Sequence, residues 1–124
     1  MTAAGNEVLL SVVVPTKNEA RNIADCLACF TGVGPAVEVL VVDNFSPDGT
    51  AGLAARAGVK VISCGPERSS QRNRGAAEAQ GRYVFFVDAD MRVPRATLVE
   101  VLGRIGSASA PDALYIPEYI VGEG

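Results

Sequence analysis

Short runs of apolar residues alternate along the chain with segments whose apolar residues recur at helical spacing. Four runs predict β-strands, at residues 8–14, 37–42, 59–62 and 83–87, and Pro15 is expected to close the first of them. The runs are nearly continuous in apolar residues, which is typical of strands that are buried on both faces. The pattern therefore predicts an α/β fold class, with a mostly parallel, Rossmann-like sheet flanked by helices.

A helical segment follows each predicted strand. The expected helices are residues 19–30, 50–57, 70–80 and a helix that opens at Pro94. Their expected starting residues are Asn18 as N-cap with Glu19 in the first turn, Thr50, and either Ser69 or Ser70. Pro94 suits a first helical position because its missing N–H would have no partner there. Residues 114–121 are expected to be extended.

The composition is that of one folded domain. The chain has 124 residues, 48% of them hydrophobic and 20% charged, so residues 1–124 are predicted to form a single soluble domain. The start of the chain lacks the basic region of a signal peptide, and no apolar run is long enough for a transmembrane segment. A net charge of −3 gives no basic footprint for nucleic acid, which is therefore not expected as a partner.

Three cysteines, Cys26, Cys29 and Cys64, form an odd set that does not resemble a disulfide framework. Cys26 and Cys29 make a C-x-x-C pair, for which a redox or zinc site is one interpretation. The chain has no histidine and no second such pair, so nitrogen and sulfur ligands cannot complete a tetrahedral zinc site. The favoured interpretation is two small apolar residues on a helix, with reduced thiols and a cytoplasmic location.

Polar residues collect where three predicted strands end. The first strand leads into residues 15–19, the second into Asp43 and Asn44, and the fourth into Asp88 and Asp90. Ligands of open parallel sheets bind at these carboxyl ends. Asp43 and Asn44 have an alternative role in capping a turn, and Glu19 an alternative role as a favourable charge near a helix N-terminus. Asp88 and Asp90 directly follow a very apolar strand, where solubility alone does not account for them.

The two aspartates, with one spacer between them, can share a cation. Hard oxygen ligands suit Mn²⁺ or Mg²⁺, whose remaining positions are usually filled by substrate phosphates and water. Arg72 on the third helix is a candidate for a second cation at the phosphates, and Arg68 and Arg74 are further candidates. For these arginines the alternative is a solvated helix face.

Other motifs exclude or weaken competing functions. The chain contains neither a P-loop nor a G-x-G-x-x-G motif, and without histidine it cannot build a Ser-His-Asp triad. A haloacid-dehalogenase-like phosphatase also carries D-x-D after an apolar strand. That motif expects Thr or Val two positions after the second aspartate, and Arg92 occupies this position.

Four segments, residues 13–19, 41–50, 71–75 and 86–90, occur in an order and spacing that resemble one family. Together they are similar to the nucleotide-sugar-binding half of a family 2 glycosyltransferase of the GT-A fold, over about residues 10–93. The resemblance implies a metal-dependent transferase that uses a nucleotide-diphosphate sugar, with a UDP-sugar favoured.

The resemblance also implies roles for single residues. Pro15, Thr16 and Glu19 would line the nucleoside pocket, Asp43 would bind the base, Arg72 would lie near the diphosphate, Asp88 near the ribose or metal, and Asp90 on the metal. Asn44 stands where the family commonly has an aspartate, which leaves the base preference open.

In the family, the acceptor-binding half and the catalytic base follow the donor half. No base can be assigned here, and the expectation is that it lies beyond the end of this chain. The function expected is therefore a glycosyltransferase or its donor-binding half acting on an unknown acceptor, with a non-catalytic nucleotide-binding remnant as the alternative. An incomplete sheet also predicts self-association, or a partner chain, near residues 114–121.

Overall fold

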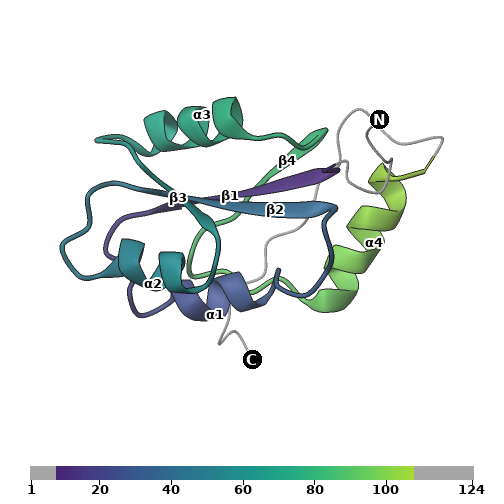
Figure 1. Cartoon of the computed structure of the whole chain (residues 1–124), viewed down its shortest axis with the longest axis horizontal. Coiled ribbons are helices and arrows are strands. Elements are labelled where there is room, and N and C mark those ends of the chain that lie inside the picture. Colours follow the sequence, from purple (N-terminus) through teal and green to yellow (C-terminus); the bar gives the residue numbers. More distant parts are fainter. Residues whose placement is uncertain (1–7, 108–124) are drawn as a thin grey trace.

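A computed structural model describes residues 8–107 of the chain and shows a four-stranded sheet (Figure 1). The strands are β1 (Leu10–Thr16), β2 (Val37–Asp43), β3 (Lys60–Ser63) and β4 (Tyr83–Phe86). Their order in the sheet is β3-β2-β1-β4, and all three pairings are parallel. The predicted α/β class with a parallel sheet is confirmed.

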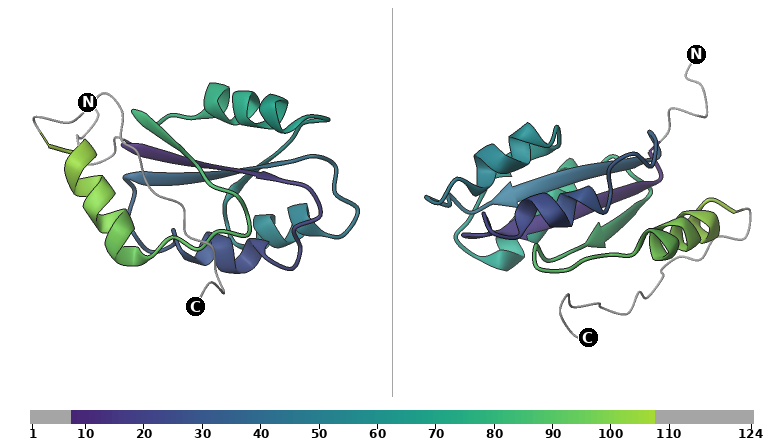
Figure 2. Two further views of the ribbon diagram at one scale, coloured as in Figure 1. Left: turned by 180° about the vertical axis from the view of Figure 1, so that it is seen from behind. Right: turned by 90° about the horizontal axis from the view of Figure 1, so that it is seen from below.

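Helices cover both faces of this sheet. They are α1 (Ile23–Ala28), α2 (Thr50–Arg56), α3 (Arg68–Glu78) and α4 (Arg95–Ile105). Helix α3 lies alone on one face, while α1, α2 and α4 lie on the other, which gives three layers (Figures 1 and 2). Both faces are thus buried, as the continuous apolar strands require.

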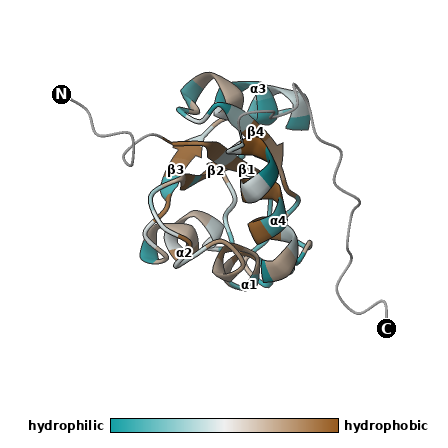
Figure 3. Cartoon of the chain, turned by 90° about the vertical axis from the view of Figure 1, so that its right-hand side faces the viewer, coloured by the Kyte–Doolittle hydropathy of each residue, from teal (hydrophilic) through white to brown (hydrophobic). Residues whose placement is uncertain are grey.

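The side chains of β1 divide the core into two parts. Leu10, Val12 and Val14 contact the larger cluster, toward α1, α2 and α4, whereas Val13 belongs to a smaller cluster beneath α3. Gly75 of α3 sits so close that a Cβ atom there would lie 2.4 Å from Cγ1 of Val13. The apolar strands form the centre of the molecule between the helix layers (Figure 3).

The predicted start of the first helix is wrong. Asn18 has a positive φ of 58°, and α1 begins only at Ile23, after Asn22. Residues between them form a turn in which the carbonyl of Glu19 accepts hydrogen bonds from the amides of Asn22 and Ile23. A residue in the left-handed region cannot act as an ordinary N-cap, whose backbone is extended.

Pro15 does not close the first strand, which continues to Thr16. The ladder with β4 ends at the pair Val13 and Phe86, followed by one hydrogen bond from the Val87 amide to the Val13 carbonyl. Beyond that point β1 pairs only with β2, so the missing amide of Pro15 faces the side without a strand.

The starts of α3 and α4 differ from the predictions by one or two residues, whereas α2 begins at Thr50, which the sequence predicted to lie at its start. Helix α3 begins at Arg68 after Glu67, so Ser69 and Ser70 lie inside it. The N-cap of α2 is Gly49, at φ 92°, and Pro94 is the extended N-cap of α4 rather than its first residue. Polar side chains near a helix start mark its place only approximately.

A polar network ties down the amino end of the sheet. The hydroxyl of the fully buried Ser11 donates to Glu38 and accepts from the amide of Gly81, and the amide of Gln80 also donates to Glu38. This network fixes the connection from α3 to β4. Within residues 8–107, no helix is both long and apolar enough to cross a bilayer. The predicted extended segment 114–121 lies outside the described residues.

Candidate functional site

The carboxyl ends of β2, β1 and β4 are neighbours at one edge of the sheet, because β1 lies between the other two. This edge carries Thr16 at the end of β1, Asp43 at the end of β2 and Asp88 just beyond β4. The parallel topology therefore brings together the three strand ends that the sequence singled out. These strand ends differ in how many hydrogen bonds the rest of the protein makes to their polar side chains.

Asp43 is a buried carboxylate, with 2% of its surface exposed. Its Oδ1 accepts hydrogen bonds from the hydroxyls of Thr16, at 2.6 Å, and Ser46, at 2.7 Å. Its Oδ2 accepts from the amide of Ser46 at 2.9 Å. Asp43 thus binds β1 to the loop that follows β2, and three of the roughly four acceptor positions of a carboxylate are occupied.

The loops after β1 and β2 are joined by further hydrogen bonds. The amide of Glu19 donates to the hydroxyl of Thr50, and the amide of Ala20 donates to Asp48. A hydrogen bond from the Thr50 hydroxyl lowers the pKa of Asp48, and backbone amides add to the effect. The Glu19 carboxylate itself accepts from Asn22 in its own turn. These loops are held in one arrangement.

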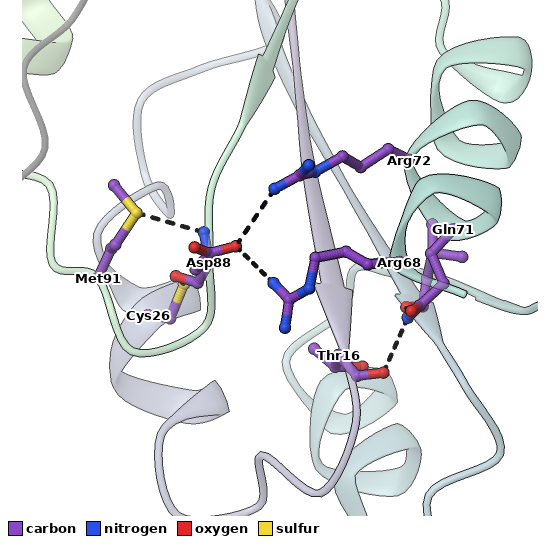
Figure 4. A network of polar contacts seen from close by, with 8 residues as sticks. Thr16, Cys26, Arg68, Gln71, Arg72, Asp88 and Met91 are labelled. Carbon is purple, nitrogen blue, oxygen red and sulfur yellow. Dashed lines mark hydrogen bonds and ion pairs between the residues drawn. The ribbon is translucent and has the colours of Figure 1, made fainter. Parts of the chain in front are cut away.

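Gln71 of α3 reaches the same edge from above the sheet. Its side-chain amide nitrogen donates to the carbonyls of Thr16, at 2.9 Å, and Val42, at 2.8 Å, and the residue is 4% exposed (Figure 4). The sequence offered no sign of this role, since a glutamine on a polar helix is ordinarily solvated. Gln71 fixes the first turns of α3 against the ends of β1 and β2.

The segment after β4 alternates between buried and exposed residues. Val87, Ala89, Met91 and Val93 are buried in the larger core cluster. The intervening Asp88 is half-buried, and Asp90 is exposed. Core packing of the apolar residues therefore turns both aspartates outward, as a D-x-D ligand pair would need.

Two arginines of α3 approach Asp88. Nη1 of Arg68 lies 2.8 Å from its Oδ1, and Nη2 of Arg72 lies 4.0 Å from the same oxygen (Figure 4). The Arg72 guanidinium also lies 6.0 Å from the centre of the Phe86 ring. Arg68 is thus nearer to Asp88 than Arg72, the candidate that the resemblance indicated. Arg74 points elsewhere and pairs with Glu78.

Contacts from beneath hold the D-x-D segment in place. Arg92, whose contribution the sequence did not suggest, donates to the carbonyls of Ala89 and Met91 and to the side chain of Asn22. The Asp88 amide donates to the sulfur of Met91, and the Cys26 thiol donates to the Asp88 carbonyl. Burial, followed by the nearby Cys29, raises the pKa of Cys26 to about 12.

The cysteines do not form a metal or disulfide site in the described part of the chain. Cys26, Cys29 and Cys64 are free thiols, and no group of three or more His, Cys, Asp or Glu residues within residues 8–107 could hold a metal by itself. Cys26 lies in the core, in agreement with the apolar interpretation. Within these residues, Asp88 and Asp90 are thus not joined by a third His, Cys, Asp or Glu ligand.

The sequence matches the family Glycosyl transferase family 2 over residues 11–120, which is most of the chain. The chain belongs to this family. Among its relatives, Glycosyltransferase AglJ of Haloferax volcanii is 40% identical over 81 residues, which are 64% of this chain and 26% of that protein. Glycosyltransferase AglE of the same organism is 35% identical over 91 residues, 65% of this chain and 30% of that protein. The family match decides against the phosphatase alternative.

Solved structures of proteins in complex with nucleotide sugars share the fold. S. aureus TarS 1-349 in complex with UDP-GlcNAc superposes with a TM-score of 0.71 and 29% identity, covering 80% of this chain and 31% of the TarS 1-349 chain. The mannosyltransferase PcManGT from Pyrobaculum calidifontis, in complex with GDP-Man and Mn²⁺, gives a TM-score of 0.68 and 27% identity, covering 82% and 33%. The chain thus spans about a third or less of the length of these proteins.

Proposed function

We propose that this chain is the donor-binding half of a glycosyltransferase and binds a nucleotide-diphosphate sugar at the carboxyl edge of its sheet. The observation that carries the proposal is the half-exposed carboxylate of Asp88, with Arg68 and Arg72 facing it at the end of β4. This arrangement offers both a cation ligand and positive charge for a diphosphate. The complexes of TarS with UDP-GlcNAc and of PcManGT with GDP-Man support the same donor class.

The carboxylates fit a Mn²⁺ or Mg²⁺ ion that is completed by its ligand. Asp88 and Asp90 supply hard oxygen atoms and stand apart from the buried polar network. Two carboxylates alone form no closed cage, which suits an ion that takes its remaining ligands from a diphosphate and water. When bound, such an ion would offset charge on the diphosphate leaving group.

The arginines have a separate part in this proposal. Arg68 holds Asp88 in an exposed ion pair, which is weak enough for a bound cation to replace it. Arg68 and Arg72 would then be free to face the phosphate oxygens, for which a planar guanidinium is well suited.

The nucleoside would occupy the other half of the edge, beside the ends of β1 and β2. Pro15 and Thr16 form the end of β1, and Glu19 lies in the turn that follows. Because most of its acceptor positions are taken, we assign Asp43 mainly to holding Thr16 and the Ser46 loop in place. Asn44, whose side chain donates to the Pro66 carbonyl, borders the same region.

Association through the β4 edge is a further part of the proposal. In the described sheet β4 is an edge strand, and Val84 and Phe86 expose 37% and 42% of their surfaces there. An apolar edge strand favours pairing with another copy or with further chain. Light scattering at increasing concentration should show dimers or larger species, and a monomer at all concentrations would contradict this part.

Calorimetry tests the donor proposal directly. UDP and GDP are titrated into the chain with and without Mn²⁺, and into the variant Asp90→Asn. The proposal predicts binding that strengthens with Mn²⁺ in the wild type, and loss of most of this metal effect in the variant. Glu100→Asn is a matched control, because Glu100 pairs with Arg104 on exposed α4.

Two results would oppose the proposal in different ways. Binding that is independent of metal and unchanged in Asp90→Asn would overturn the role of the D-x-D pair. Absence of nucleotide binding under all conditions would overturn donor binding itself. Binding without hydrolysis of any UDP-sugar would favour a donor-binding module that has no turnover of its own.

A further inference from the structure

Phe45 combines two unfavourable features in a single residue. The residue exposes 68% of its surface, the largest fraction among the large hydrophobic residues that are exposed in the described chain. Its φ is 51°, in the left-handed region that residues with a Cβ atom rarely adopt. Glycine would adopt the same backbone without a steric penalty and would expose no aromatic surface.

The loop around Phe45 is held firmly on both sides. The side chain of Lys17 donates to the Asn44 carbonyl at 2.8 Å, and the Asn44 side chain donates to the Pro66 carbonyl at 2.8 Å. On the other side, the Ser46 hydroxyl accepts from the Asn18 amide and donates to Asp43. The exposure of the ring is therefore a consequence of an anchored loop.

The position of this loop gives the aromatic ring a function. Phe45 lies two residues beyond the end of β2, at the edge where Thr16, Asp43 and Asn44 meet. Unusual backbone conformations that the surrounding structure maintains are concentrated at binding sites. An aromatic side chain held at such an edge is suited to stacking against a flat, uncharged ring.

The end of β4 carries the charged groups that suit the phosphates of a nucleotide, which leaves the end of β2 for its base. Asp88, Arg68 and Arg72 suit phosphates and a cation at the end of β4. The β2 end is on the far side of β1 from them. There the charged groups Lys17 and Asp43 are engaged in hydrogen bonds within the loops. Beside them lie the neutral Asn44 and the aromatic Phe45. Phe86 is exposed as well, but it lies beside the Arg72 guanidinium and so belongs to the charged half.

We propose that Phe45 is the stacking platform for the nucleobase of the donor, an inference that rests on the proposed function. Stacking on an aromatic side chain tolerates any base, since every base presents a π-face. Phe45 would thus contribute affinity for the nucleoside, and base preference would come from hydrogen bonds with neighbours such as Asn44.

Fluorescence provides the first test. The natural chain contains no tryptophan, so Phe45→Trp introduces a single tryptophan, at the proposed platform, whose fluorescence can be followed. Titration of this variant with UDP and with GDP, in the presence of Mn²⁺, should quench its fluorescence with saturation. Val99→Trp is the matched control, because Val99 is 58% exposed on α4 and should report no change.

Affinity provides the second test, with a probe that lacks a base. Phe45→Gly should weaken binding of UDP and GDP about tenfold, by loss of one stacked base, and should leave binding of inorganic pyrophosphate unchanged. Phe45→Tyr should restore the wild-type affinity. Because glycine suits the backbone at this position, Phe45→Gly is expected to fold at least as well as the natural chain.

The outcomes separate this inference from the proposed function. If the natural chain binds nucleotide and Phe45→Gly binds it equally well, stacking on Phe45 is overturned while donor binding stands. Equal weakening of pyrophosphate and nucleotide in Phe45→Gly would also overturn it, since the residue would then act on the whole site. If the natural chain binds no nucleotide, both proposals fail together.

Discussion

Asp43 and Asp88 are carboxylates on either side of the end of β1, and their surroundings are opposite in character. Asp43 is 2% exposed and accepts three hydrogen bonds from Thr16 and Ser46. Asp88 has a side chain that is 40% exposed, and its partners are the exposed guanidinium groups of Arg68 and Arg72. A buried and satisfied group contributes to the shape of an edge, whereas an exposed ion pair can exchange its partner for a ligand.

The largest expected effect on stability comes from removing the buried carboxylate of Asp43. Asp43→Ala leaves the hydroxyls of Thr16 and Ser46 and one amide without their acceptor, in a place that water reaches poorly. We expect a loss of about 2–4 kcal/mol in the free energy of unfolding, measured by urea denaturation.

Asp88→Ala is the matched variant for that measurement. Its ion pairs are exposed, so its free energy of unfolding should change by less than about 1 kcal/mol. Similar losses in the two variants would contradict the distinction between Asp43, which holds the loops in place, and Asp88, which can exchange its partner for a ligand.

The second largest expected effect on stability concerns Gln71, which is buried like Asp43. Gln71→Leu has a similar volume but leaves the carbonyls of Thr16 and Val42 without its amide donor. The expected loss of stability is about 1–3 kcal/mol by urea denaturation. Arg74→Leu on the exposed face of the same helix should change stability by no more than about 0.5 kcal/mol. A cost for Gln71→Leu no greater than this control would contradict the assigned role.

The third expected effect on stability concerns Cys26, whose thiol donates to the carbonyl of Asp88. The pKa of Cys26 is raised from 9.0 to about 12 by burial, so above pH 9 the unfolded chain ionises this thiol while the folded chain does not. Ionisation therefore favours unfolding, and stability should fall by about 1 kcal/mol by pH 10 from this residue.

Thermal unfolding as a function of pH, with Cys26→Ala as reference, isolates this contribution. The variant has lost the thiol, so its stability should decline less steeply between pH 8 and pH 10. Parallel curves for the natural chain and the variant would show that Cys26 is not shielded as the structure indicates.

The smallest expected effect is on the exposed side. Arg68→Gln removes the 2.8 Å ion pair with Asp88, yet stability should change by no more than about 0.5 kcal/mol, because exposed pairs gain little. Denaturation at low and high salt should make even this difference smaller as salt screens the charges. A loss as large as that of Asp43→Ala would mean that the Asp88 pair is part of the framework.

The sequence predicted what depends on local pattern. The continuous apolar runs gave the parallel sheet, and the position of Asp88 and Asp90 directly after the fourth run placed them at its carboxyl edge. The alternation of buried Ala89 and Met91 with these aspartates follows from the same pattern. Their roles toward donor and metal stay predictions.

The remaining features depend on tertiary contacts. Gln71 gains its role only because α3 lies over the ends of β1 and β2, which its own surroundings in the sequence do not reveal. The late start of α1 follows from the left-handed backbone at Asn18, a residue that a simple capping rule assigned to the helix. Whether Arg68 or Arg72 lies nearer to Asp88 depends on helix orientation and side-chain conformation, which spacing does not fix.

The most direct test of the account is to locate a bound cation along the chain. Small amounts of Mn²⁺ are added to the isotopically labelled chain in the presence of UDP, and the backbone amide signals are followed by NMR. Paramagnetic broadening falls steeply with distance from the ion. The account predicts that the signals of four residues near the proposed ion disappear first: Asp88, Asp90, Arg68 and Arg72. The signals of Ser11, Glu38 and Gly81, at the amino end of the sheet, should stay sharp. Broadening centred at the amino end of the sheet, or spread evenly over the chain, would contradict a cation site at Asp88 and Asp90.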